Sequence, residues 1–200
     1  MKNFEDKNQE VQEPDLTGTY TARDYISWKT DELMELIRGK VFKMAAAPSS
    51  DHQKVVMSLG TILYLHFLKK CEVYSAPFDV YLIRSSEDWK SAKNVVQPDL
   101  CVICDPEKIH LRGCIGVPDL VVEILSPSTR LKDLGAKRDL YEEYGVKEFW
   151  IVHPQDATLA VHVLENGKYR ITSLVTKGQS FQSPTFPDLQ VDLDAVFPDE

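Results

Sequence analysis

Two apolar runs that share a Pro-Asp dipeptide constrain the fold of this chain more than any other feature. The runs read VVQPDLCVICD (residues 95–105) and VPDLVVEILS (residues 117–126). A nearly continuous apolar run is typical of a central strand that is covered on both faces of its sheet. A proline at the start of a strand costs little, because the ladder does not yet need its missing N–H group. The two runs therefore predict a sheet with a buried centre.

Helical and extended patterns surround these runs. Before them we expect a short helix capped by Thr21 and Asp24, a hairpin over residues 32–45 turning at Arg38-Gly39, a helix over residues 47–70 with Ser50 and Gln53 as its capping box, and a strand or bent pair over residues 71–83. After them we expect a helix over residues 131–145 ending at Gly145, a strand over residues 147–154, and a hairpin over residues 157–175 turning at Asn166-Gly167.

This order of elements predicts an α/β (α+β) fold. It combines a mixed central β-sheet flanked by helices with a C-terminal β-hairpin. No repeat or linker interrupts the pattern, so we expect residues 19–200 to form a single domain. Residues 1–18 are polar and predict a disordered tail.

Composition narrows the class of protein. The formal net charge of −8 argues against a protein that coats nucleic acid by bulk attraction, but not against an enzyme that acts on it. No stretch approaches the roughly 20 apolar residues of a membrane span, and residues 1–18 lack the apolar core of a signal peptide.

The cysteines favour a reduced protein. Four are present, without the spacing of a disulfide framework: Cys71, Cys101, Cys104 and Cys114. We therefore expect free thiols and a cytoplasmic location. Cys101 and Cys104 are three residues apart in a predicted strand, which sends their side chains to opposite faces, so core positions are favoured over a zinc site.

Glu123 is a charged residue in the middle of an apolar strand. A buried carboxylate is tolerated only where it is paired, hydrogen-bonded or bound to metal. Strand alternation places Glu123 and Leu125 on one face, with Val122 and Ile124 on the other. We interpret Glu123 as a functional carboxylate, with a structural ion pair or an edge position facing water as the alternative.

Lys137 has the same anomaly on the following helix. At about 100° per residue from Asp133, the apolar stripe is centred near 20–30° and Lys137 lies near 40°. A lysine inside a buried stripe predicts an anion at its ammonium group, although a lysine that snorkels over the sheet edge is the alternative. The loop between strand and helix is short, so Asp99, Glu123 and Lys137 can converge. Two carboxylates suit a hard cation such as Mg²⁺.

The segments QPD, PDLVVEILSPST and KDLGAKRDLYEEYGVKEFWIV resemble the PD-(D/E)XK nuclease superfamily, and most closely its Uma family of restriction endonuclease-like proteins. The resemblance runs from about Tyr20 to Phe197 and implies a restriction endonuclease-like domain. It also implies that Asp99 and Glu123 are ligands of Mg²⁺ or Mn²⁺, with the backbone carbonyl of Ile124 as a candidate third ligand.

The chain departs from the superfamily pattern at Leu125, where the usual lysine would stand. In several branches that lysine lies on the following helix, and Lys137 fits this variant. Glu35 resembles an additional N-terminal acidic position of the family, with an exposed hairpin residue as the alternative. His52, at a helix start, could touch substrate, but a capping or exposed position is the favoured interpretation.

These observations predict a metal-dependent endonuclease that hydrolyses phosphodiester bonds of DNA. Its catalytic residues would be Asp99, Glu123, Lys137 and Glu35, and its partners would be nucleic acid and a second copy in a homodimer. The basic residues Arg130, Lys132, Lys137 and Arg138 could contact phosphates or form a solvated face. The alternative is a non-catalytic nucleic-acid-binding or regulatory module on a nuclease-like scaffold, with Glu123 and Lys137 as a metal-free ion pair.

Overall fold

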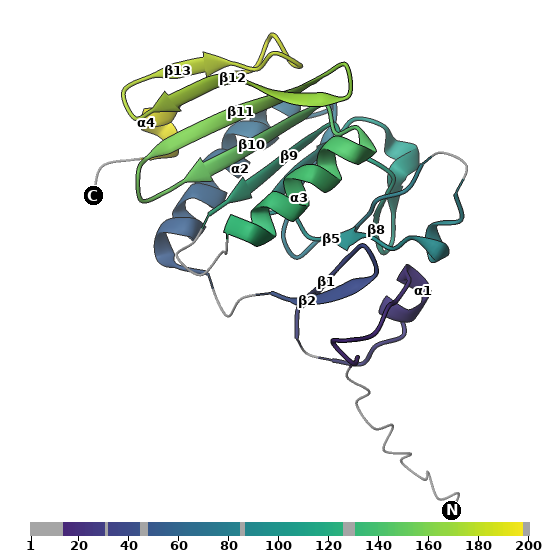
Figure 1. Cartoon of the computed structure of the whole chain (residues 1–200). Helices are drawn as coiled ribbons and strands as arrows, with labels where there is room; N and C mark the ends of the chain where they lie inside the picture. Colours follow the sequence, from purple (N-terminus) through teal and green to yellow (C-terminus); the bar gives the residue numbers. More distant parts are fainter. Residues whose placement is uncertain (1–13, 31, 45–47, 85–86, 126–130, 198–200) are drawn as a thin grey trace, which may run out of the picture.

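Two six-stranded sheets and a two-stranded ribbon form the β-structure of the residues that the structure describes. Figure 1 shows the computed structural model, which describes residues 14–30, 32–44, 48–84, 87–125 and 131–197. The mixed α+β architecture predicted from the sequence is confirmed. Its strands, however, are divided between two sheets, where the sequence predicted one central sheet.

The bounds of the elements are as follows. The N-terminal sheet has the order β2 (Lys40–Lys43), β1 (Met34–Ile37), β5 (Val95–Val96), β4 (Val80–Tyr81), β8 (Gly113–Ile115) and β7 (Ile109–His110). The central sheet has the order β12 (Lys168–Thr176), β11 (Thr158–Glu165), β10 (Glu148–His153), β9 (Leu120–Ile124), β6 (Leu100–Ile103) and β3 (Glu72–Ser75). The ribbon pairs β13 (Ser180–Gln182) with β14 (Gln190–Asp192), and the α-helices are α1 (Ala22–Tyr25), α2 (Ser50–Phe67), α3 (Leu131–Tyr144) and α4 (Leu193–Val196).

The central sheet is covered on both faces by helices (Figure 1). Its middle strand β9 runs parallel to β10 and antiparallel to β6. Val122 and Ile124 pack with α2 in one core, whereas Val121 packs with α3 and the N-terminal sheet in another. Burial on both faces explains why the strand sequence is apolar throughout, as the sequence predicted.

The run at residues 95–105 is not one strand. The chain leaves the N-terminal sheet after Val96 and joins the central sheet at Leu100, so Gln97, Pro98 and Asp99 form a junction between the sheets. Pro98 lacks the N–H group that would continue a ladder, which explains a break in an otherwise apolar run. This junction places Asp99 at the end of the central sheet.

Local signals position most elements correctly. Both predicted hairpin turns have the positive φ angles that a type I′ turn requires, at Arg38-Gly39 and at Asn166-Gly167. The predicted cap of α2 is wrong by one residue. The N-cap is Ser49, whose hydroxyl accepts a hydrogen bond from the His52 backbone N–H at 3.3 Å. This shift makes His52 the third residue of the helix.

Two of the cysteines differ from the prediction. Cys71 and Cys104 form a disulfide, whereas Cys101 and Cys114 are buried and free. Glu72 pairs with Ile103 across β3 and β6, so Cys71 and Cys104 lie directly opposite each other at the strand ends. Pairing across strands depends on tertiary register, which cysteine spacing does not contain.

Two further predictions concern the ends of the chain and membranes. Residues 1–13 lie outside the described residues. Residues 14–18 of the predicted tail are described, and the carbonyls of Thr17 and Gly18 accept hydrogen bonds from Lys40 Nζ at 2.9 and 2.8 Å. Among the described residues, no helix is long and apolar enough to cross a membrane.

Candidate active site

Glu123 and Lys137 form a buried ion pair. Glu123 lies on β9 with 7% of its surface exposed, and Lys137 lies on α3 with 8% exposed. Lys137 Nζ is 3.1 Å from Glu123 Oε1 and 3.3 Å from Oε2. Lys137 therefore lies in the apolar stripe of α3, as its helical angle predicted. Its side chain points inward and contacts the Glu123 carboxylate.

Glu35 joins this pair from the other sheet. It lies on β1, is buried, and approaches Lys137 Nζ to 2.7 Å. The same carboxylate oxygen accepts a hydrogen bond of 2.7 Å from the backbone N–H of Gln97, in the junction between the sheets. Glu35 is therefore not an exposed hairpin residue, and the Lys137 ammonium lies between two carboxylates.

Tyr141 is a member of the cluster that the sequence analysis did not identify. Its hydroxyl donates to Glu123 Oε1 at 2.7 Å. Burial, with the charges of Glu123 and Glu35, raises the pKa of Tyr141 well above its ordinary value, so it stays a donor. Tyr141 lies four residues after Lys137, so both side chains are on the same helical face. This spacing could have predicted that Tyr141 belongs to the cluster.

The charges in this cluster are not balanced. Burial raises the pKa of the Glu123 carboxyl to about 7, against the lowering effect of the Lys137 ammonium. Burial by itself would lower the pKa of Lys137, but the carboxylates of Glu123 and Glu35 outweigh it and raise that pKa above its ordinary value. Lys137 is thus a cation at neutral pH, and the carboxylates around it outnumber it.

Asp99 lies at the same end of the central sheet. Leu100 pairs with Val122, which sets Asp99 across from Glu123. Asp99 Oδ2 accepts a hydrogen bond of 2.6 Å from the Ile124 backbone N–H. The structure therefore brings together the three residues predicted as metal ligands: Glu123 and Ile124 on β9, and Asp99 in the junction that leads into β6.

His52 holds the other oxygen of Asp99. His52 Nε2 is 3.1 Å from Asp99 Oδ1, and the imidazole is buried. The interpretation of His52 as a capping or exposed residue is therefore wrong for its side chain. His52 shares the inner face of α2 with Val55 and Leu59, three and seven residues on, and this spacing was the missed signal.

The oxygen donors fit a hard cation. Among the described residues no group of three metal-ligating side chains is preformed. Asp99 and Glu123 supply two carboxylates, and the carbonyl of Ile124 is a third oxygen beside them. Mg²⁺ typically takes one or two carboxylates and keeps several waters, so this small donor set is sufficient.

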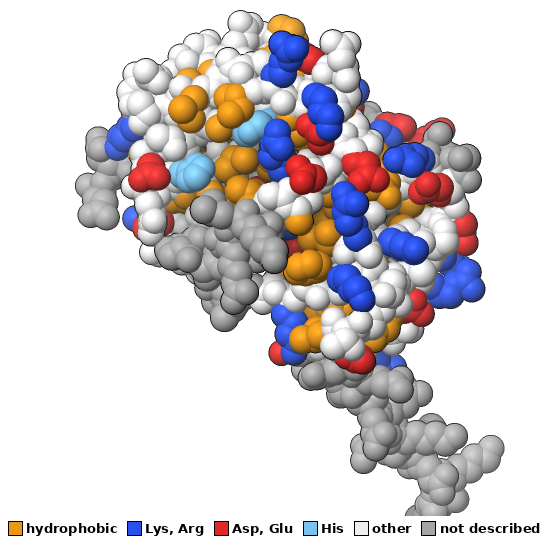
Figure 2. Space-filling model, in the orientation of Figure 1, with side chains coloured by type: hydrophobic (Ala, Val, Ile, Leu, Met, Phe, Trp, Pro, Cys, Tyr) orange, Lys and Arg blue, Asp and Glu red, His pale blue; other side chains and the backbone are white. Residues whose placement is uncertain are grey.

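The surface near α3 is mixed in charge. Figure 2 shows basic and acidic side chains interspersed over this face. Arg138, from the predicted basic cluster, lies beside Asp139 and over the Tyr169 ring. Arg130 lies outside the described residues, as does the side chain of Lys132. The described part of this face is therefore mixed in charge rather than broadly positive.

A comparison with known families identifies the family of this chain. A family model described as Uma2, "Putative restriction endonuclease", matches residues 22–194, which is most of the chain and includes every residue of the site. The chain belongs to the Uma2 family. The family predicted from the sequence is thereby confirmed, and a nuclease-like function is the activity that its description supports.

Two similar proteins extend this assignment. The chain is 30% identical over 124 residues to the "Uncharacterized protein slr1290" of Synechocystis sp.. That match covers 60% of this chain and 61% of the relative, so the chain spans about three-fifths of its length. A solved structure titled as a "putative nuclease belonging to DUF820" from Anabaena variabilis superposes with a TM-score of 0.68 at 16% identity, covering 88% of this chain and 97% of that one. The superposition supports the Uma2 fold.

Proposed function

We propose that this Uma2 protein is an endonuclease that hydrolyses phosphodiester bonds of DNA with Mg²⁺ or Mn²⁺. One observation carries the proposal: a buried lysine cation lies between Glu35 and Glu123, while Asp99 lies across from Glu123 at the start of the neighbouring strand β6. Family membership supports the nuclease class. The donor set supports a divalent cation, and the excess of carboxylates gives that cation a reason to bind.

Each residue has a defined task in this proposal. Asp99 and Glu123, with the Ile124 carbonyl, would hold the cation. A bound divalent cation polarises a phosphoryl oxygen and acidifies a bound water. Lys137 stays protonated, so it stabilises negative charge on the phosphate and orients the attacking water rather than removing a proton. Glu35 fixes the direction of the ammonium, and Tyr141 fixes the carboxylate of Glu123.

Cleavage of supercoiled plasmid DNA tests the proposal. We expect nicked or linear products with Mg²⁺ or Mn²⁺ and none with chelator. Glu123→Gln and Lys137→Ala should each lower the rate by at least about 100-fold, because each removes a group that acts on developing charge. A parallel assay with a single-stranded RNA of matched length separates deoxyribonuclease from ribonuclease activity.

Matched variants control for charge and folding. Glu165→Gln and Lys90→Ala remove the same kinds of group from exposed positions, and both should cleave like the wild type. Far-UV circular dichroism should show all four proteins folded. Cleavage that survives Glu123→Gln and Lys137→Ala in a clean preparation would overturn the assignment.

The second candidate is a non-catalytic nucleic-acid-binding or regulatory module. One observation favours it: the Lys137 ammonium and Tyr141 hydroxyl already satisfy Glu123 without a metal. Calorimetric titration with Mn²⁺ separates the candidates. Binding that is lost in Asp99→Asn supports the enzyme, whereas no binding to the wild type supports the module.

A further inference from the structure

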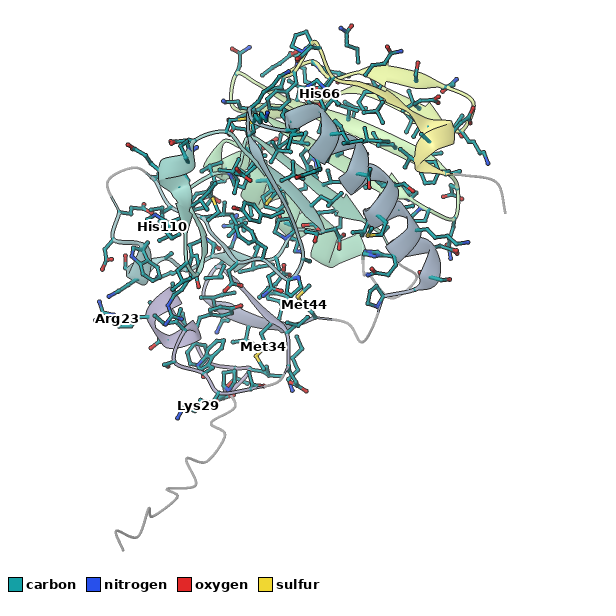
Figure 3. All side chains as sticks on the ribbon, turned by 180° about the vertical axis from the view of Figure 1, so that it is seen from behind. Arg23, Lys29, Met34, Met44, His66 and His110 are labelled. Carbon is teal, nitrogen blue, oxygen red and sulfur yellow. A yellow bond between two sulfur atoms is a disulfide. The ribbon has the colours of Figure 1, made fainter. Side chains whose placement is uncertain are left out.

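His52 reaches the candidate metal site from the layer opposite Lys137. It is the third residue of α2, which covers the face of the central sheet away from α3 (Figures 1 and 3). Its Nε2 atom lies 3.1 Å from Asp99 Oδ1, with 7% of the residue exposed. The end of the central sheet that carries Asp99 and Glu123 therefore has Lys137 on one face and His52 on the other.

One oxygen donor contacts the imidazole, and a second lies next to it. Asp99 Oδ1 is the contact of His52 Nε2, and Asp99 Oδ2 accepts a hydrogen bond of 2.6 Å from the Ile124 backbone N–H, so the Ile124 backbone lies beside this carboxylate. Asp99 and Ile124 are the two donors, besides Glu123, that the proposed function assigns to the metal.

The spacing of these atoms is that of ligands on one metal. In an octahedral site with bonds of about 2.1 Å, neighbouring donor atoms lie about 3 Å apart. The distance of 3.1 Å from His52 Nε2 to Asp99 Oδ1 matches this edge. A hydrogen bond joins the two atoms here, and a cation coordinated by both would take the place of the shared proton.

The second ring nitrogen of His52, Nδ1, is buried and has no hydrogen-bond partner among the described residues. Asp99 is therefore the contact that fixes the ring proton on Nε2. A metal ligand at Nε2 would need the neutral ring with its proton on Nδ1.

We infer that His52 is a nitrogen ligand of the divalent cation in this site, together with Asp99 and the Ile124 carbonyl. This inference rests on the proposed function, because it assumes that the site binds a cation. An imidazole nitrogen suits transition metals better than Mg²⁺, which favours oxygen ligands and retains its waters. The site therefore prefers Mn²⁺ to Mg²⁺.

Pulsed electron paramagnetic resonance on the Mn²⁺-loaded full chain tests the ligand directly. The wild type should show modulation from a directly bound ¹⁴N nucleus, and His52→Gln should lose it. Glutamine keeps a donor for Asp99 and much of the side-chain volume. By calorimetry, His52→Gln should weaken Mn²⁺ binding by about 10-fold or more and reduce the preference over Mg²⁺.

A second histidine of the same helix supplies the control. His66 lies 3.5 Å from Asp188, away from the site, so His66→Gln should keep both the ¹⁴N signal and the Mn²⁺ affinity. Mn²⁺ bound in an Asp99-dependent way without ¹⁴N coupling would overturn the role of His52 and leave the proposed function standing. No Mn²⁺ binding to the wild type, or binding unaltered by Asp99→Asn, would overturn both.

Discussion

Two buried glutamates on neighbouring strands of the central sheet have opposite surroundings. Glu123 on β9 receives hydrogen bonds from Lys137 and Tyr141. Glu148 on β10 is fully buried, and its donors are neutral: Trp150 Nε1 at 2.6 Å, the Ser183 hydroxyl at 2.9 Å and the Thr185 backbone N–H at 2.8 Å. Glu123 therefore has a charged hydrogen-bond partner, whereas the partners of Glu148 are all neutral groups.

The two carboxylates also face different layers. Glu123 shares its face with Val121 and α3, whereas Glu148 lies on the face of Trp150, which packs with α2 and the C-terminal segment. Glu148 ties the chain around Ser183 to the sheet, which is a structural task. A buried carboxylate therefore does not by itself identify a site. What distinguishes the candidate site at Glu123 is a second carboxylate and a cation beside it.

The largest expected effect comes from removing the cation. Lys137→Met should lower the free energy of unfolding by about 3–5 kcal/mol at neutral pH, because Glu35 and Glu123 are left buried without a positive charge. Urea unfolding measures this change. Lys168→Met removes an exposed ammonium from its ion pair with Glu142 and should cost less than about 1 kcal/mol. Equal losses in Lys137→Met and Lys168→Met would show that the buried cation beside Glu123 contributes no more to stability than an exposed lysine does.

The counterpart at Glu148 should affect folding and not cleavage. Glu148→Ala leaves three buried donors without an acceptor, which should cost about 1–3 kcal/mol of stability. The folded fraction should cleave plasmid DNA at the wild-type rate per molecule. A variant that is folded by circular dichroism yet inactive would show that Glu148 belongs to the site.

The pH dependence of stability sharpens the comparison. The pKa of Glu123 is about 7 in the folded protein, above its ordinary 4.5. Between these values the folded state holds more protons than the unfolded chain, so the free energy of unfolding falls as pH rises. The slope from this group is at most about 1.4 kcal/mol per pH unit. Unfolding in chelator at pH 5 and pH 7 should show a shallower fall for Glu123→Gln than for the wild type. Identical falls would contradict the shift.

The smallest expected effect is at Tyr141. Tyr141→Phe removes one donor from Glu123 but leaves Lys137 in place, so it should cost about 1 kcal/mol. Tyr169→Phe is a matched control, because its buried hydroxyl donates to the Val146 carbonyl outside the site. Both should lose similar stability, and only Tyr141→Phe should slow cleavage. Equal cleavage rates for Tyr141→Phe and Tyr169→Phe would show that Tyr141 has no role in cleavage.

The sequence predicts those parts of the site that follow from local geometry. The inward direction of Lys137 follows from helical spacing, and the face of Glu123 follows from strand alternation. The exchange between sheets after Val96 could not be predicted, because β5 is two residues long and its apolar run continues into β6. Two of the three donors of Glu148 likewise belong to residues 35 and 37 positions away.

His52 and the disulfide illustrate the same limit. Spacing along α2 indicates that His52 faces inward, but its contact with Asp99 is set by how the helix packs on the sheet. The bond between Cys71 and Cys104 depends on the register of β3 against β6. Local patterns indicate which side of an element is buried, whereas tertiary packing determines what it meets there.

The junction at Gln97 and Asp99 ties the geometry of the site to the assembly of the molecule. Gln97 is fastened to Glu35 in one sheet, and Asp99, two residues later, is fastened to Ile124 in the other. Only Pro98 separates Gln97 from Asp99. A residue inserted or deleted here would therefore shift the Asp99 carboxylate relative to that of Glu35. The junction therefore acts as a fixed-length spacer, and the two sheets cannot slide past each other while the site keeps its shape.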